Sequence, residues 1–415
     1  MIESGDGPDP EPAKEFESSP RWVYVPVCVA FVLCFATIAK TVLGATRGTT
    51  GLAQEQLDVS QPPYCPIPEL HDRPIVCFVN YVYRQEHFSH QNIPSHLCRH
   101  VVLCCLTDIT KQERERAVAE GTALQTILPR TLLYLGFGGS HVNYTAVNLW
   151  FSNDSAVETL VDAIIRTALG LGFKGGAAVM LTDWMRIENR RMLANFTNRL
   201  RLKLEQKGDY SLVILMPPRP NAVVSYPMDL LSYGSTIPIA LSHVTDVDTP
   251  HMGFLSCLTP NHFAGAMSYG YNVSLESMWQ GLKELYDRSW PSLKKEIGYS
   301  FSLAWTYYVQ NVVTKRTAGE PGILVGFVTY NNACTSALGR NRRTYRDYLT
   351  DCQVISDGLY SWFSGLGEES TQFLREHRDV RALGIFDIEF DDVNGVCRGF
   401  KFPQLQALHD VFRQS

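Results

Sequence analysis

Eight short apolar segments, most of them separated by helical stretches, constrain the fold of this chain more than any other feature. Their lengths are typical of β-strands. The segments are Ile75–Asn80, His100–Leu106, Thr131–Gly136, Ala177–Leu181, Ser211–Met216, Ile237–His243, Ile297–Ala304 and Ala382–Ile388. One of them, Ala177–Leu181, is apolar throughout, which is typical of a strand buried on both faces in a helix-covered parallel sheet.

Helical patterns lie between many of these segments. Ala156–Leu171 places apolar residues at helical spacing along one face, and Glu188–Gln206, Leu275–Arg288 and Gly365–His377 show similar patterns. Eight strands alternating with helices over roughly 340 residues are typical of the α/β class. We therefore predict a (β/α)8 TIM barrel over residues 73–415.

The N-terminal 72 residues read as three different segments. Residues 1–21 are rich in Pro, Glu, Asp, Gly and Ser and predict a disordered tail. Residues 22–45 are apolar apart from Lys40 and are long enough to cross a bilayer as one transmembrane helix. Residues 46–72 are rich in Gly, Thr, Gln and Pro and predict a stalk.

The apolar run at 22–45 favours a signal anchor. A cleaved signal peptide normally begins with a short basic stretch, whereas this run follows a long acidic one. Eleven cysteines occur in the chain, and four glycosylation sequons begin at Asn143, Asn153, Asn195 and Asn272. Together they favour the secretory pathway for the C-terminal part. We expect a single-pass type II membrane protein with a cytoplasmic tail and an extracellular or lumenal barrel, secreted if the anchor is cleaved.

Several functional classes are disfavoured. The formal net charge of −5 gives no reason to expect a nucleic-acid partner. The chain contains no Cys-x-x-Cys pair, so we predict no zinc site, and no sequence feature points to a cofactor. Acidic residues gather at Asp387, Glu389, Asp391 and Asp392, where we expect a solvated loop rather than a metal site.

Motifs near both ends of the barrel region carry a family resemblance. The first strand continues to Tyr81 as Ile-Val-Cys-Phe-Val-Asn-Tyr, and Leu-Cys-Arg-His precedes the second strand. The last strand reads Phe386-Asp-Ile-Glu-Phe-Asp-Asp392, followed by Cys397. From about residue 74 to 412 the chain resembles glycoside hydrolase family 18, the chitinases and chitinase-like lectins.

The resemblance implies further structural features. It implies disulfides Cys77–Cys98 and Cys352–Cys397, and it leaves open the pairing of Cys65, Cys104, Cys105, Cys257 and Cys334. The insertion subdomain that the family carries before its eighth strand is expected in reduced form, near Thr306–Arg343.

The fourth strand carries the catalytic acids of the family. A Glu there protonates the glycosidic oxygen, and an Asp positions the acetamido group of the substrate, which is itself the nucleophile. Alignment on Gly172-Phe173 puts Lys174, Ala177, Val179 and Leu181 at the acidic positions of the motif. Because Leu181 cannot donate a proton, the resemblance implies a pseudoenzyme.

The expected sugar-binding floor also departs from the family pattern. The Trp beneath the sugar in the last strand is replaced by Phe386. Our candidates for ligand contact are Tyr81, Trp184, Phe386 and Asp387.

Three functions are compatible with this sequence. The first is a non-catalytic, membrane-tethered ectodomain that binds chitin, other N-acetylglucosamine-containing glycans or a protein partner. The second is an active glycosidase that cleaves chitin-type β-1,4 linkages with a relocated acid, for which Glu188 is the nearest candidate. The third is a signalling or scaffold protein without sugar binding. The sequence does not indicate the oligomeric state.

Overall fold

The computed structural model describes residues 73–80, 88–139, 142, 144–180, 190–216, 235–243, 255–259, 274–276, 278–280, 297–310, 322–336, 343–347, 350–356, 360–366, 368–377 and 380–413. The predicted tail, anchor and stalk lie outside these residues. Within these ranges, no helix combines the length and the apolarity needed to cross a bilayer.

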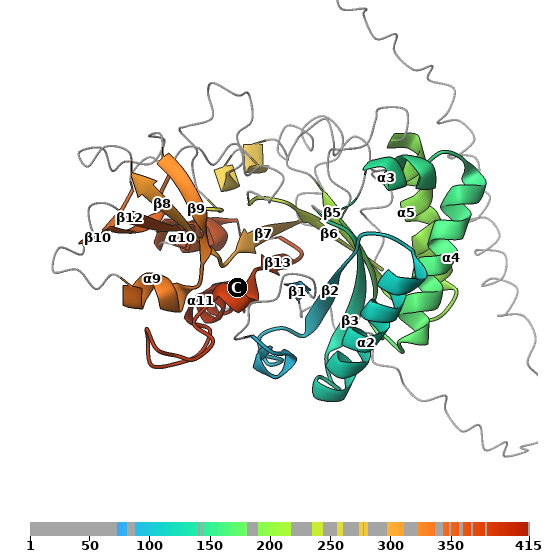
Figure 1. Cartoon of the computed structure of the whole chain (residues 1–415), viewed down its shortest axis with the longest axis horizontal. Helices are drawn as coiled ribbons and strands as arrows, with labels where there is room; N and C mark the ends of the chain where they lie inside the picture. Colours follow the sequence, from blue (N-terminus) through green and yellow to red (C-terminus); the bar gives the residue numbers. More distant parts are fainter. Residues whose placement is uncertain are drawn as a thin grey trace, which may run out of the picture. The chain divides into compact units, whose positions relative to one another are not determined.

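Eight parallel strands form a closed barrel in the order β1-β13-β7-β6-β5-β4-β3-β2 (Figure 1). The strands are β1 (Ile75–Asn80), β2 (His100–Leu106), β3 (Leu132–Gly138), β4 (Gly176–Met180), β5 (Ser211–Met216), β6 (Thr236–Ala240), β7 (Gly298–Ser302) and β13 (Leu383–Phe386). Each corresponds to one predicted segment, so the (β/α)8 barrel is confirmed.

Helices cover the outside of the barrel. They include α2 (Lys111–Ile127), α3 (Tyr144–Trp150), α4 (Asp154–Gly170), α5 (Arg190–Glu205), α10 (Glu368–Glu376) and α11 (Pro403–Arg413). Helices α4, α5 and α10 confirm predicted stretches, whereas most of the predicted helix Leu275–Arg288 lies outside the described residues. The prediction missed α2, which buries only Ala117, Gly121 and Leu124 along its length and therefore shows little apolar periodicity.

Side chains alternate between the two faces of the barrel sheet. The interior face holds Val76, Phe78, Val102, Tyr134, Ala178, Val213, Leu215, Ile237, Ile239, Leu241, Ala382 and Phe386, with no helical residue among them. The outer face packs against the helices, as where Val179 joins Val161 of α4 and Phe196 of α5 in one buried layer. This alternation follows from the two-residue period of a strand.

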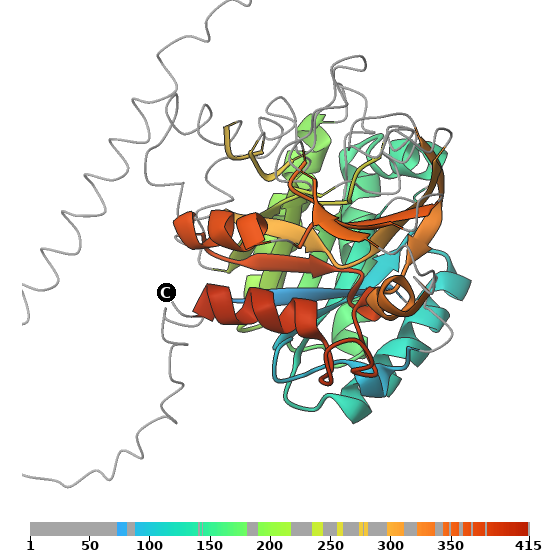
Figure 2. The same cartoon turned by 90° about the vertical axis from the view of Figure 1, so that its left-hand side faces the viewer.

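A second sheet is inserted between β7 and β13. It is antiparallel, in the order β10-β11-β12-β8-β9, and Figure 2 views the molecule from its side. Its strands are β8 (Trp305–Gln310), β9 (Gly322–Val328), β10 (Arg343–Arg346), β11 (Gln353–Ser356) and β12 (Tyr360–Ser364), and α9 (Tyr330–Ser336) lies within the same insertion. The predicted bounds Thr306–Arg343 were therefore too short, because the last three strands have only four or five residues and show little apolar pattern.

The disulfides confirm one predicted pair and correct the other. Cys77 is bonded to Cys98 as expected. The predicted bond Cys352–Cys397 is wrong. Cys352 is bonded to Cys257, which lies between β6 and β7, and both are buried in one cluster with residues of the inserted sheet. Cys397 follows the short helix η7 (Ile388–Phe390) and is bonded to Cys334 of α9. A fourth bond joins the adjacent residues Cys104 and Cys105, and Cys65 lies outside the described residues.

We expect the Cys257–Cys352 bond to contribute most to stability. It spans 95 residues, against 21 for Cys77–Cys98, and loop-closure entropy increases with loop length. The double substitution Cys257→Ser/Cys352→Ser should lower the free energy of unfolding by about 4 kcal/mol in urea denaturation. Non-reducing peptide mapping checks the pairing, and a peptide linked through Cys352 and Cys397 would refute it.

Candidate functional site at the carboxyl end of the barrel

Strand β4 presents uncharged groups to the barrel interior. Ala178 belongs to the interior layer and Met180 packs against it. Ala177 and Val179 face the helices instead. In the family motif the acidic positions point into the barrel, and we aligned Ala177 and Val179 with two of them. Both side chains point outward, so this expectation is wrong, and the inward positions are those one residue further along the strand.

Strand β4 begins at a glycine with a backbone conformation that no apolar pattern reveals. Gly176 has a φ of +119°, and a Cβ at this position would lie 2.2 Å from the carbonyl oxygen of Ser211. Because side chains alternate along a strand, a one-residue difference in register at this point moves every following side chain to the other face. Lys174 is exposed and precedes the amino end of β4, away from the carboxyl end where barrel enzymes hold their sites. Leu181 and Trp184 lie outside the described residues.

The floor of the barrel mouth, meaning the carboxyl ends of the strands, contains an aromatic stack. The ring of Phe386 is parallel to that of Phe78, with 4.1 Å between centroids and 6° between planes. The His243 ring lies 4.4 Å from the Phe386 centroid at 44°. Phe386 is thus inside the barrel as predicted, but neighbours contact its ring on more than one side and it is only 9% exposed. Tyr81 lies outside the described residues.

Strand β7 contributes two inward serines. The Oγ of Ser300 is 2.8 Å from Nδ1 of His243, and burial lowers the pKa of this histidine to about 3, so it is neutral at physiological pH. The hydroxyl of Ser302 donates to the carboxylate of Asp387 at the end of β13. Our sequence reasoning missed both serines and His243. Ser300 and Ser302 are two residues apart on the predicted strand Ile297–Ala304, and this spacing could have indicated that both hydroxyls lie on the same face.

The acidic segment after β13 is buried, so the expected solvated loop is wrong. Asp391 and Asp392 are buried, and Glu389 is 5% exposed. The carboxylate of Asp391 accepts hydrogen bonds from the backbone N–H groups of Gln404 and Leu405 at the start of α11. Asp392 accepts two backbone N–H groups of the following loop. These carboxylates therefore hold the polypeptide chain in place.

Glu389 differs from its two neighbours. Burial, followed by the nearby charge of Asp387, raises the pKa of Glu389 to about 8. Its Oε2 atom has no hydrogen-bond partner within the described structure. Across the described ranges, no group of three His, Cys, Asp or Glu side chains could hold a metal ion.

The raised pKa of Glu389 predicts a pH dependence of stability. Between pH 4.5 and about 8 the folded chain retains a proton that the unfolded chain releases, so stability is highest below this window and falls as pH rises through it. Glu389→Gln removes this contribution and should be more stable than the parent chain above pH 8 by roughly 2–4 kcal/mol, with little difference near pH 4.5. Urea denaturation across pH measures this difference. The exposed substitution Glu376→Gln is the control, and an equal effect of both variants would contradict the assignment.

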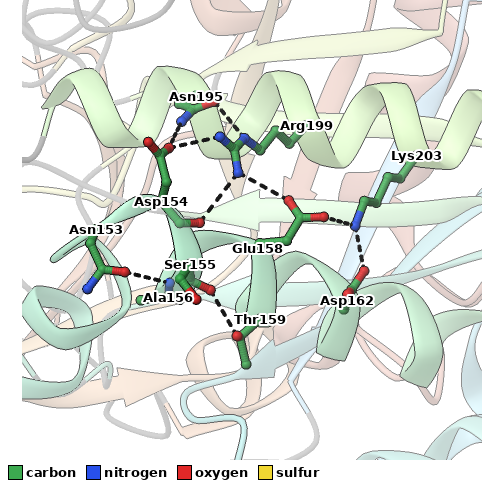
Figure 3. Close-up of polar contacts among 10 residues, drawn as sticks. All are labelled: Asn153, Asp154, Ser155, Ala156, Glu158, Thr159, Asp162, Asn195, Arg199 and Lys203. Atoms are coloured by element: carbon green, nitrogen blue, oxygen red, sulfur yellow. Dashed lines mark hydrogen bonds and ion pairs between the residues drawn. The ribbon is translucent and has the colours of Figure 1, made fainter.

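The two described sequons occupy different environments on α4 and α5 (Figure 3). Asn153 is exposed and caps α4, where its Oδ1 accepts the N–H of Ala156 at 2.9 Å. Asn195 lies within α5. Its Nδ2 donates to Asp154 at 2.6 Å, and its Oδ1 accepts from Arg199 Nε at 2.9 Å. Asn143 and Asn272 lie outside the described residues.

Asn195 belongs to an ion network that joins the two helices (Figure 3). Arg199 pairs with Asp154 at 2.8 Å and with Glu158 at 3.2 Å. Lys203 pairs with the same Glu158 and, at 2.6 Å, with Asp162. The hydrogen bond from Lys203 is the main cause of the lowered pKa of Glu158. A glycan on the Asn195 amide nitrogen would have to fit beside Asp154, to which this nitrogen donates.

We therefore expect the two sequons to differ in occupancy. In chain expressed through the secretory pathway, Asn153 should carry a glycan and Asn195 should be predominantly unmodified, because Thr197 of its sequon is also buried. Glycopeptide mass spectrometry measures both sites, with Asn153→Gln and Asn195→Gln as matched controls. Full occupancy at Asn195 in a folded chain would show that the α4–α5 contact does not protect it.

Comparison with known proteins supports the fold. No protein-family model matches the sequence, and no curated protein sequence matches it significantly. Solved structures do match. The group IV chitinase of Ostrinia furnacalis in complex with allosamidin has a TM-score of 0.67 at 15% identity, over 83% of this chain and 99% of that chain.

Two further structures were solved with chitooligosaccharides. The class V chitinase of Nicotiana tobaccum in complex with NAG4 has a TM-score of 0.64 at 13% identity, over 82% of this chain and 99% of that one. YKL-39 in the presence of chitooligosaccharides has a TM-score of 0.64 at 15% identity, with the same coverage. At these identities the similarity establishes a shared fold.

Proposed function

We propose that this chain, which has the fold of the family 18 chitinases and chitinase-like proteins, is a non-catalytic ectodomain that binds N-acetylglucosamine-containing glycans at the barrel mouth. We further propose that residues 22–45 anchor it as a single-pass type II membrane protein. The apolar run and the sequons support this location.

The uncharged inward face of β4 is the observation that carries the non-catalytic proposal. Its described inward positions are Gly176, Ala178 and Met180. Family 18 hydrolysis needs a proton donor and an acid that positions the acetamido group. None of these three side chains can donate a proton or carry a negative charge. Without such groups, general acid catalysis worth about 10²–10⁴-fold is lost.

Two observations support glycan binding. Structural neighbours with chitooligosaccharides share this barrel, and ligands of such barrels bind at the carboxyl ends of the strands. There the chain offers the apolar surface of Met180 and a fixed acceptor, the Asp387 carboxylate held by Ser302. A carboxylate that accepts sugar hydroxyls next to an apolar floor is a common means of orienting a sugar.

The proposal predicts that the chain binds an oligosaccharide and does not hydrolyse it. The full-length chain in detergent should bind an N-acetylglucosamine tetramer in calorimetry and release no chromophore from a chromogenic oligomer. Asp387→Asn should weaken the affinity by about tenfold, because a charged acceptor is lost. Lys174→Gln, at the other end of β4, should leave the affinity unchanged. Chromophore release that Glu188→Gln abolishes would instead establish the relocated-acid glycosidase.

A scaffold without sugar binding is the second candidate. The contacts that Phe78 and His243 make with Phe386 favour it, because they leave little of the ring for a sugar to stack on. The same titration separates the two candidates. No heat at millimolar oligosaccharide, from chain with an intact thermal unfolding transition, would favour the scaffold.

A further inference from the structure

Three sulfur atoms converge at the carboxyl ends of β2 and β4. The Sγ atoms of Cys104 and Cys105 lie 3.1 Å and 3.2 Å from the Sδ atom of Met180. Met180 is half-buried and packs against the interior layer, and the two cysteines are 9% and 6% exposed. The proposed glycan site does not explain why all three groups at this point carry sulfur.

The bond between Cys104 and Cys105 is not a structural crosslink. A disulfide stabilises a fold mainly by closing a loop in the unfolded chain, and the effect grows with loop length. The other disulfides span 21, 95 and 63 residues, whereas this one joins sequence neighbours. It removes almost no freedom from the unfolded chain, so the loop-closure effect predicts little change in stability when it is reduced.

The backbone holds the two contributing strands in a defined relation. β3 lies between β2 and β4, and the N–H of Gly139 donates to the carbonyl of Met180 at 2.9 Å. Gly138 has a φ of +111°, and a Cβ there would lie 2.3 Å from the same carbonyl oxygen. The position of Met180 beside the cysteines is therefore set by main-chain packing, which keeps the sulfur groups together after the disulfide opens.

We propose that Cys104, Cys105 and Met180 form a redox-gated site for copper(I). In the oxidised form the cysteine sulfurs are bonded to each other. In the reduced form two thiolates and one thioether face a common point. Soft sulfur ligands of this kind select copper(I) over hard cations, and a thioether is not a usual zinc ligand.

A dithiol can supply the two electrons that opening the Cys104–Cys105 bond requires. The dithiol transfers two electrons, the Cys104–Cys105 bond breaks, two thiols form, and the reductant becomes a cyclic disulfide. Copper(I) then displaces the two thiol protons as it binds. Exchange with an external disulfide reverses these steps: the two thiolates give two electrons to that disulfide, which becomes a dithiol, the Cys104–Cys105 bond re-forms, and copper(I) is released. The site shares Met180 with the proposed glycan site but requires neither Asp387 nor Phe386, so copper binding can be measured separately from glycan binding.

The experiment uses the full-length chain with Cys28, Cys34 and Cys65 replaced by serine in every sample. After dithiothreitol treatment and its removal under argon, copper(I) is titrated against bathocuproine disulfonate. We expect one tightly bound copper(I) per reduced chain and none per oxidised chain. Cys104→Ser/Cys105→Ser should abolish binding, and Met180→Leu should weaken it by at least about tenfold.

Two control variants test whether copper(I) binds at Cys104, Cys105 and Met180 rather than at other sulfur atoms of the chain. Met192→Leu changes a methionine of α5 outside the barrel interior and should not alter copper affinity. Cys334→Ser/Cys397→Ser removes the partly exposed disulfide of the inserted subdomain and should also have no effect. Copper binding that survives in the Cys104→Ser/Cys105→Ser chain, or its absence from reduced parent chain with a normal thermal transition, overturns the proposal.

Discussion

The alternation of side chains across a closed parallel sheet is the constraint on which the rest of the structure depends. Closure leaves an interior that holds one set of apolar residues, from Val76 on β1 to Phe386 on β13, while the alternate set packs under the helices. The site chemistry follows from this division. A residue on a strand can act at the barrel mouth only if the strand presents it inward, whatever its position in a sequence motif.

The division also explains which parts of the structure were predictable from sequence. Strands buried on both faces need continuous apolar runs, so all eight barrel strands could be found. The direction of the β4 side chains could not be predicted, because a continuous apolar run does not show which residues face the interior, and the positive φ of Gly176 leaves no mark in that run. The inserted strands were missed for a different reason. Segments such as Gln353–Ser356 are too short to show the alternation of apolar and polar residues that identifies a strand.

Charge patterns were a poorer guide than apolar ones. Four acids within Asp387–Asp392 resemble a solvated loop, yet three of them are buried. Asp391 and Asp392 compensate for their burial by accepting backbone N–H groups that would otherwise lack partners. Those donors lie up to 14 residues away along the chain, so local sequence contains no sign of them. The disulfide partners of Cys352 and Cys397 could not be read from sequence for the same reason.

The functions that we propose for the mouth of this barrel rest on its lack of acids on the described part of β4 and on its sulfur atoms. Carboxylates at its centre need solvation or donors to remain charged, and the described inward face of β4 supplies neither acids nor donors. Met180 is apolar and polarisable, and it lies against two further sulfur atoms. Acid catalysis requires a group that exchanges protons with the substrate, whereas the proposed copper(I) site requires two thiols to lose their protons to form thiolates. The described part of this mouth combines three sulfur atoms, neutral His243 and the partly covered ring of Phe386, and this combination supports the binding role that we propose.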